Sequence, residues 1–241
     1  MKHKIDPKVD CVFKAVLGNE RHRNLLIHFL NAVLEPEEGS RIRDVTIMNP
    51  YNEREFVGDK MSIVDVKAAD EKGAIYQIEI QMQLRVGLTH RMLFTWSRIY
   101  GSHIGEGDDY PKLKPVISIW ILSGSLFPDI TEEYHFPFTV CNTDHGLVLS
   151  DHLAIHVLEL PKWKPVGTAR KEKERWIYFF REGEHTDLGN PPDILNTQEM
   201  RQAMSVLEEF SEKEKNYLLY QSRLEAILEQ NTLIREREEA L

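Results

Sequence analysis

The sequence predicts an α/β protein in which a helix, three strands, a second helix and a fourth strand follow one another. Apolar residues recur at helical spacing in 21–34 and 88–104, polar and apolar residues alternate between 63 and 82, and a continuous apolar run covers 116–122. Residues 199–241 predict a helical extension behind this αβββαβ core.

The first helix of the core is expected over residues 21–34. Its apolar positions repeat every three or four residues, and Pro36 ends it. A shorter helix is expected before it, at 10–17, and Gly18 ends that one. Residues 42–48 then alternate between apolar and polar, which predicts the first strand.

A hairpin is predicted between residues 63 and 82, because two alternating segments flank the polar turn 70–73. The apolar positions of the first segment include Val64 and Val66. Successive side chains of a strand point to opposite faces, so each segment has one apolar and one polar face.

The polar face of this hairpin is the main functional clue. Gln77, Glu79 and Gln81 share a face of the second segment, and Asp65 and Lys67 share a face of the first. Two carboxylates brought together in this way suit a hard divalent cation, which takes oxygen ligands. The alternative is an ordinary water-facing surface, which needs no function.

The remaining elements follow from local patterns. The helix expected at 88–104 is followed by the run 116–122, whose apolar and β-branched character is typical of a strand buried on both faces. Further strands are expected at 134–140 and 153–160, and a further helix at 168–180.

The chain is expected to divide into an α/β domain at 1–182, a linker at 183–198 and a helical region at 199–241. From Tyr217 onwards, mostly apolar residues follow three-four spacing, with Asn231 at a core position, which is typical of a short coiled coil. Self-association through this helix and packing of the helix on its own domain are the two alternatives.

Composition excludes several classes of protein. The chain has 241 residues, 41% of them hydrophobic and 29% charged, which is typical of globular proteins and not of disordered ones. It contains neither a signal-like segment nor an apolar run of about 20 residues, so we expect a cytoplasmic protein without a membrane partner. Its two cysteines, Cys11 and Cys141, make no disulfide framework.

The net charge of −9 argues against a broadly basic surface for nucleic acid, so any DNA contact must come from a local patch. Arg91 and Arg98 are seven residues apart on one predicted helix and therefore share a face. With Arg85 and His90 they can form such a phosphate-binding patch. The alternative is an ordinary solvated helix face.

Short motifs, in this order along the predicted elements, resemble the PD-(D/E)XK nuclease superfamily. They are Asp10-x-x-Phe13-Lys14, Asp65-Val66-Lys67-Ala68 and Glu79-Ile80-Gln81. Residues 5–125 are most similar to its Rpn branch of recombination-promoting nucleases, whose members are also described as transposases. The resemblance implies a restriction-endonuclease-like fold with a mixed sheet, metal-dependent cleavage, and DNA as the partner.

The resemblance also implies roles for the motif residues. Asp65 and Glu79 would be carboxylate ligands of Mg²⁺, or of Mn²⁺, and the carbonyl of Ile80 would add a third oxygen. Gln81 stands where the superfamily has a lysine, but the Rpn branch is similar to this chain in having Glu-x-Gln. An amide does not titrate, so Gln81 would position the attacking water or the phosphate and not act as a base.

Lys67 can supply the cation that Gln81 lacks, since it lies two residues from Asp65; the alternative is a solvent-facing lysine near a turn. Asp10 and Lys14 are spaced for an ion pair within one helix, worth roughly a few tenths of a kcal/mol. The motif instead implies that they lie near the site, where Asp10 would help to hold metal.

Two functions follow as hypotheses. The first is a Mg²⁺-dependent DNA endonuclease associated with recombination or transposable elements, and the presence of both acids favours it. The second is a domain of the same fold that no longer cuts and acts as a nucleic-acid or protein binding module. The glutamine at position 81 and the negative charge are compatible with the second.

Overall fold

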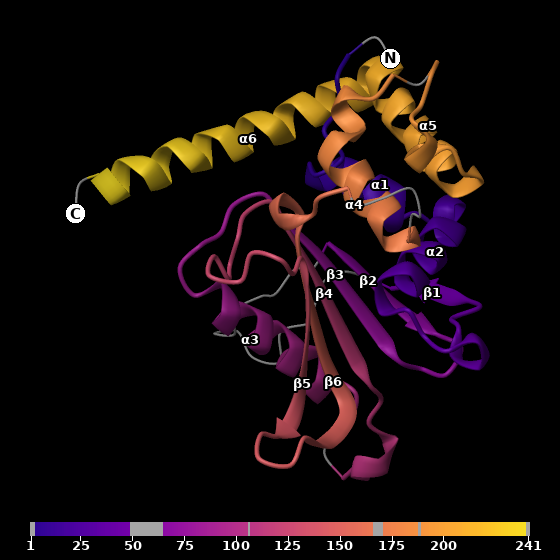
Figure 1. Ribbon diagram of the computed structural model, residues 1–241, viewed down its shortest axis with the longest axis vertical. Coiled ribbons are helices and arrows are strands. Elements are labelled where there is room, and N and C mark those ends of the chain that lie inside the picture. The colour runs from indigo at the N-terminus through magenta and orange to yellow at the C-terminus, as the bar shows by residue number, and fades with distance from the viewer. Residues whose placement is uncertain (1–2, 49–64, 106, 166–170, 188, 240–241) are drawn as a thin grey trace. The chain divides into compact units, whose positions relative to one another are not determined.

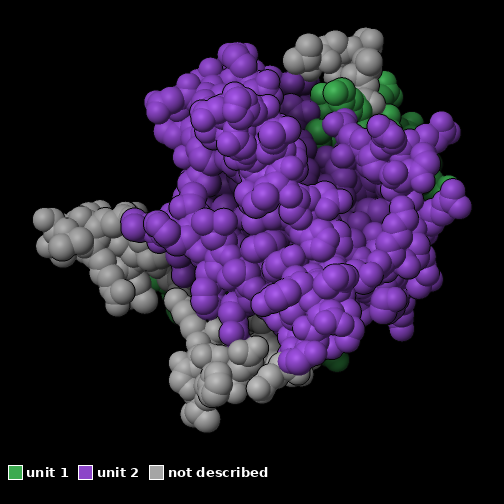
Figure 2. Space-filling model, turned by 90° about the horizontal axis from the view of Figure 1, so that it is seen from below, with its two compact units in different colours: residues 1–16, 170–241 green, residues 17–169 purple. Residues whose placement is uncertain are grey.

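The computed structural model (Figure 1) describes most of the chain, namely residues 3–48, 65–105, 107–165, 171–187 and 189–239. These residues form two compact units, coloured in Figure 2: one consists of residues 17–169, and the other of residues 1–16 together with 170–241. Within the described residues, no helix is long and apolar enough to cross a membrane.

The unit of residues 17–169 is built on one mixed, six-stranded sheet. Its strands are β1 (Val45–Ile47), β2 (Val66–Asp70), β3 (Ile75–Gln81), β4 (Val116–Leu122), β5 (His135–Asn142) and β6 (Leu147–Glu159). Their spatial order is β1-β2-β3-β4-β6-β5. The first three strands are antiparallel, β3, β4 and β6 are parallel, and β5 returns antiparallel to β6.

Two helices complete the predicted core. Helix α2 (Arg23–Leu34) precedes β1, and α3 (Leu88–Gly101) joins β3 to β4, so the order α2-β1-β2-β3-α3-β4 confirms the predicted αβββαβ core. Helix α3 ends three residues before its predicted end. Its last residue, Gly101, is a poor helix former, which explains the earlier stop.

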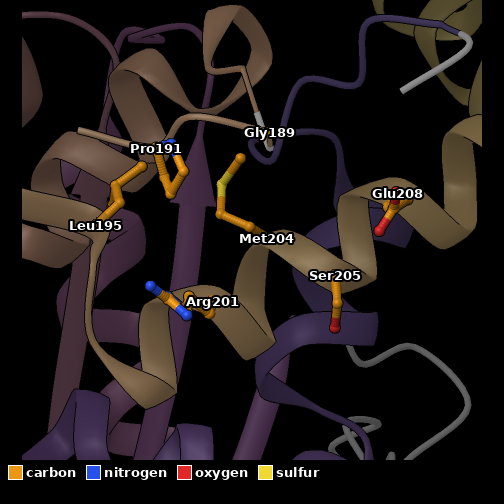
Figure 3. Close-up of a pocket in the computed structure, with 7 residues that line it drawn as sticks. All are labelled: Gly189, Pro191, Leu195, Arg201, Met204, Ser205 and Glu208. Carbon is orange, nitrogen blue, oxygen red and sulfur yellow. The ribbon is translucent and has the colours of Figure 1, made fainter. Parts of the chain in front are cut away.

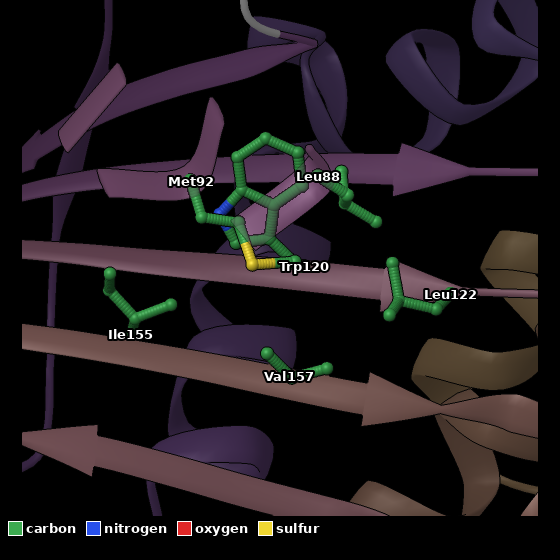
Figure 4. Close-up of a cluster of buried hydrophobic side chains, with 6 residues drawn as sticks. All are labelled: Leu88, Met92, Trp120, Leu122, Ile155 and Val157. Carbon is green, nitrogen blue, oxygen red and sulfur yellow. The ribbon is translucent and has the colours of Figure 1, made fainter. Parts of the chain in front are cut away.

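Helix α3 covers one face of the sheet. Its Leu88 and Met92 form a buried cluster (Figure 4) with β4 and β6 side chains, namely Trp120, Leu122, Ile155 and Val157. The indole Nε1 of Trp96 also donates to the carbonyl of Val116, at 3.0 Å, which ties the helix to the start of β4. The crossover between the parallel strands β3 and β4 therefore lies against the sheet it connects.

The predicted hairpin is confirmed as the antiparallel pair β2–β3. Gly73 has a φ of 85°, a left-handed conformation that glycine adopts without strain. The carboxylate of Asp70 organises the turn, because its Oδ1 accepts from the backbone amides of Lys72 and Ala74, both at 2.9 Å. Ile63 and Val64, at the start of the predicted first segment, lie outside the described residues.

Strand β4 is buried on both faces, as its apolar run predicts. Strand β6 begins six residues earlier than the predicted 153–160, at Leu147. The added part pairs only with the far half of β5, for example Leu147 with Asn142, and residues 147–151 are exposed. Backbone pairing within a hairpin therefore maintains a strand whose side chains show no buried face.

The unit of residues 1–16 and 170–241 is helical. It holds α1 (Asp10–Leu17, whose last residue belongs to the other unit), α4 (Glu172–Glu182), α5 (Gln198–Glu212) and α6 (Glu214–Glu239). Residues 168–170 of the helix predicted at 168–180 lie outside the described residues.

The unit boundaries fall after residues 16 and 169, whereas the predicted domain boundaries lie at 182 and 199. The segment predicted as a linker contributes Ile194 and Leu195 to buried positions. The division into a domain, a linker and a helical region stays a prediction, as does the coiled coil formed by α6.

Candidate active site

The two carboxylates of the predicted site belong to the hairpin of β2 and β3. Asp65 directly precedes β2, whose first residue, Val66, pairs with Ile78, and Glu79 is the next residue along β3. The Oδ2 of Asp65 accepts a hydrogen bond from the backbone amide of Ile80, at 3.0 Å. The hairpin therefore brings together the aspartate, the glutamate and the isoleucine that the motifs single out.

Glu79 is buried, with its side chain only 2% exposed, and its Oε2 atom receives two hydrogen bonds. Gln81 Nε2 donates at 3.3 Å, and Arg91 Nη2 donates at 3.2 Å. Arg91 Nη1 also lies 3.5 Å from Gln81 Oε1, and its guanidinium carbon lies 5.5 Å from the ring centre of Trp120. One arginine thus reaches both the acid and the amide of the Glu-x-Gln motif.

Burial explains why this arginine matters. A carboxylate removed from water is costly unless a cation and hydrogen bonds compensate it. Arg91 supplies the cation from the first turn of α3, which places it above the end of β3. Its own side chain is 44% exposed, so this ion pair has one buried member and one member that reaches solvent.

Gln77 is fully buried and held by a short relay of hydrogen bonds. The indole Nε1 of Trp120 donates to Ser118 Oγ at 2.8 Å, and Ser118 Oγ donates to Gln77 Oε1 at 3.0 Å. The Gln77 Nε2 makes no hydrogen bond within the described residues. The side-chain amide of Gln77 is therefore held in the interior, on the face of β3 that also carries Glu79.

The interpretation of this face as water-facing is wrong. Gln77 is 0% exposed and Glu79 2%. Both lie on the face that α3 covers, since the strand residues opposite them, Ser118 and Trp120, are buried beneath that helix. The alternation in the sequence identified correctly which residues share this face of β3, but the helix that covers the face decides whether it is exposed to solvent.

The alternative of a solvent-facing Lys67 is also wrong, because its residue is only 9% exposed. Lys67 lies opposite Gln77, on the polar side of the hairpin. Its charge also affects His103. Burial is the main cause that lowers the pKa of His103, and the charges of Lys67 and His152 lower it further. Lys67 is therefore an interior cation near the site.

The basic residues line the segment after β3. Between Ile80 and Gly105 the chain contains no aspartate or glutamate but three arginines, in a protein whose net charge is −9. Arg85 is exposed in the loop before α3, and Arg98 is partly exposed two turns after Arg91. The acidic protein thus contains a local stretch that is free of negative charge.

Asp10 and Lys14 belong to the other unit, on α1. Asp10 Oδ2 lies 3.9 Å from Lys14 Nζ, and also 3.9 Å from Arg223 Nε. The expected ion pair within the helix is present. Their placement near Asp65 stays a prediction.

The donor set fits a hard divalent cation. Among the described residues, no group of three or more histidines, cysteines, aspartates and glutamates could hold a metal. The carboxylates of Asp65 and Glu79 and the carbonyl of Ile80 nevertheless suit Mg²⁺, which keeps several of its waters and needs few protein ligands. The guanidinium on Glu79 shows that a cation is already accommodated at this carboxylate.

A cavity elsewhere in the molecule differs from this site in chemistry. It lies in the helical unit, has a volume of about 320 Å³, and is lined in part by Arg201, Ser205 and Glu208 of α5 (Figure 3). Glu208 is the single carboxylate among its lining residues. None of the predicted site residues lines it.

Sequence reasoning missed three contributors to the site. Ser118 and Trp120 lie inside the apolar run 116–122, which indicates a buried strand. The serine is the one hydroxyl residue in this run, and it was the only sign that a polar contact is made there. The link from Arg91 to Glu79 was missed because it joins a helix to a strand. No periodic pattern predicts such a contact.

Comparison with known proteins agrees with this arrangement. The family model described as "PD-(D/E)XK nuclease family transposase" matches residues 7–237. Searches of curated proteins and of solved structures each gave no significant match. The mixed sheet, the αβββαβ core and the C-terminal helices are consistent with a restriction-endonuclease-like fold. The chain therefore belongs to the PD-(D/E)XK nuclease family of transposases.

Proposed function

We propose that this protein is a Mg²⁺-dependent DNA endonuclease that acts in recombination or in the movement of transposable elements. The observation that carries the proposal is the contact of Asp65 with the Glu-x-Gln motif: its carboxylate accepts from the backbone amide of Ile80, the residue next to Glu79. Membership of a nuclease family supports phosphodiester hydrolysis as the chemistry.

The proposal assigns a role to each residue of the candidate site. Asp65, Glu79 and the carbonyl of Ile80 hold Mg²⁺, and Mn²⁺ can replace it. When bound, the ion polarises a phosphate oxygen and lowers the pKa of a coordinated water. Gln81 orients that water or the phosphate through its amide. Lys67 adds positive charge to the interior behind the carboxylates, which favours an anionic substrate.

DNA would approach along the segment that is free of acidic residues. Arg85 and Arg98 are its outer phosphate contacts, and phosphate contacts fix the register of a protein on DNA without reading sequence. Arg91 belongs to the same segment but lies closer to the carboxylates.

The test is cleavage of supercoiled plasmid by the full chain with Mg²⁺, Mn²⁺, Ca²⁺ or EDTA. Asp65→Asn and Glu79→Gln keep the shape of each side chain and remove its charge. Asp144→Asn, at an exposed position in the β5–β6 turn, is the matched control. Metal-dependent cutting that both site variants lose and the control keeps supports the enzyme.

The binding module remains the second candidate, because Gln81 replaces the lysine of the superfamily and the protein is acidic. It predicts the opposite result in the same experiment. The wild type would then match Asp65→Asn and Glu79→Gln with every metal, while DNA or a protein partner would still bind to all three.

Self-association through α6 is part of the proposal. The three-four spacing of mostly apolar residues from Tyr217 onwards supports it, because such a seam is typical of helices that pack against a partner helix. The mass of the full chain in solution, measured by light scattering, decides between a monomer and a homo-oligomer. A cytoplasmic location is likewise proposed and is checked by cell fractionation.

A further inference from the structure

Arg91 joins an exposed cation to a buried anion. Glu79 is 2% exposed, Arg91 is 44% exposed, and their nearest atoms are 3.2 Å apart. The same guanidinium lies 3.5 Å from Gln81 Oε1 and over the indole of Trp120. The arginine therefore covers the solvent side of the Glu-x-Gln motif.

A divalent cation at Glu79 would compete with this arginine. Arg91 and Gln81 both donate to the Oε2 atom of Glu79, and Oε1 belongs to the same small carboxylate. A metal ion on either oxygen would therefore lie close to the guanidinium, and two cations at one carboxylate repel each other, most strongly where burial limits screening by water. Metal binding at Glu79 should thus weaken the Arg91–Glu79 ion pair.

We propose that Arg91 is a displaceable counter-ion, which pairs with Glu79 when no metal is bound and contacts a DNA phosphate when metal takes its place. This inference rests on the proposed nuclease function. A guanidinium presents a planar fork of donors that matches phosphate oxygens, so it can exchange one anionic partner for another. It would supply the positive charge that a lysine supplies where this chain has Gln81.

Arg91 suits this role better than the other nearby cations. Lys67 is almost fully buried and lies opposite Gln77, away from solvent. Arg98 is seven residues further along α3, which is about 10 Å at 1.5 Å per residue. Arg91 contacts both Glu79 and Gln81 from the first turn of α3.

The buried ring of Trp120 holds the side chain of Arg91 in place. Its ring is fully buried, and its Nε1 donates to Ser118 Oγ at 2.8 Å, so the indole cannot easily turn. An arginine over an aromatic face remains attracted to it after a change of hydrogen-bond partner. The geometry lets the end of the side chain exchange partners while its stem stays in place.

The test compares full-length wild type with Arg91→Gln, Arg91→Lys and the control Arg43→Gln, at an exposed arginine before β1. Three quantities are measured: Mn²⁺ affinity by calorimetry without DNA, the metal-induced shift in melting temperature, and plasmid cleavage at saturating metal. Melting curves also establish that each variant is folded.

We expect opposite effects on binding and cleavage. Arg91→Gln removes the competitor, so it should bind Mn²⁺ about tenfold more tightly and show a larger metal-induced rise in melting temperature. It should also cleave about 100-fold more slowly, because one positive charge at the phosphate is lost. Arg91→Lys should lie between it and the wild type, and Arg43→Gln should match the wild type in Mn²⁺ affinity.

Failure of this inference and failure of the nuclease proposal give different results. If the wild type binds metal and cuts DNA while Arg91→Gln gains no affinity, the counter-ion role is overturned and the nuclease stands. If Arg91→Gln gains affinity but neither protein cuts, displacement of Arg91 by metal is supported, while its transfer to a scissile phosphate and the nuclease are rejected. A wild type that binds no metal overturns both.

Discussion

Glu79 on β3 and Glu159 on β6 are equally buried carboxylates near the ends of two strands that flank β4, yet their surroundings differ. Glu159 Oε1 accepts from the backbone amides of Leu126 and Phe127, at 2.8 and 2.9 Å. Its Oε2 lies 2.6 Å from the Nζ of Lys162, whose side chain is 8% exposed. The counter-ion of Glu79 is instead an arginine that is 44% exposed.

This difference fits a structural role for Glu159 and the proposed metal-binding role of Glu79. The partners of Glu159 are two backbone amides, the hydroxyl of Ser125 and a buried lysine, all within the protein interior or its edge. The cation of Glu79 reaches solvent and can be exchanged for another cation. Burial alone does not distinguish the two carboxylates, whereas the exposure of the counter-ion differs between them.

The largest expected effect concerns Glu79 and activity. Glu79→Gln removes a proposed metal ligand, so plasmid cleavage should fall about a thousandfold or more. Its free energy of unfolding in urea without metal should change much less, because the amide keeps the shape of the side chain. A variant that still cuts at the wild-type rate would remove Glu79 from the site.

For Glu159 we expect the opposite pattern, with a large loss of stability and little change in cleavage. Lys162→Met leaves that carboxylate buried without its cation, which should lower the free energy of unfolding by about 3 kcal/mol or more. Cleavage per folded molecule should stay near the wild-type rate. Urea denaturation followed by tryptophan fluorescence measures the first quantity, and unchanged stability would show that Glu159 tolerates exchange as Glu79 does.

A smaller effect is expected at Ser118. Ser118→Ala removes the hydroxyl that joins Trp120 Nε1 to Gln77 Oε1, so both groups lose a buried partner. The free energy of unfolding should fall by about 1–3 kcal/mol. The Mn²⁺ affinity of the variant shows whether this relay also supports the site at Glu79. A lower affinity would give Ser118 a positioning role at the site, and an unchanged affinity would show that Ser118 only stabilises the fold.

The smallest effect concerns a group that burial keeps uncharged. Burial, Lys67 and His152 lower the pKa of His103, so this histidine takes up a proton more readily in the unfolded chain. Stability should therefore fall as the pH drops below about 6.5, the ordinary value. His103→Gln should weaken this dependence, which melting temperatures between pH 5 and 8 would reveal; an unchanged slope would show that His103 contributes little.

Local patterns were sufficient for most of the fold. The helices, the hairpin and β4 follow from spacing, from the turn at 70–73 and from an apolar run, all of which act within a few residues. The antiparallel pairing of β2 with β3 followed too, because a hairpin with a defined turn fixes its own register. These features need no knowledge of distant segments. The roles of Asp65 and Glu79 stay a prediction.

Features that depend on packing could not be predicted in this way. The burial of Lys67 and Gln77 depends on tertiary packing, and alternation alone makes such a face look water-facing. The Arg91–Glu79 ion pair depends on how α3 lies on the sheet. The long β6 depends on pairing with β5, since its first residues have no buried side.

The short connection between β3 and α3 has a consequence for inheritance. Asp65, Glu79, Gln81 and Arg91 all come from one uninterrupted stretch of the chain, 65–91. A single exchange of genetic material can therefore transfer the whole constellation between related proteins, whereas an active site gathered from distant segments needs several coordinated changes. Chimaeras should be joined outside 65–122, so that β4 and its Trp120 travel with the arginine that rests on it.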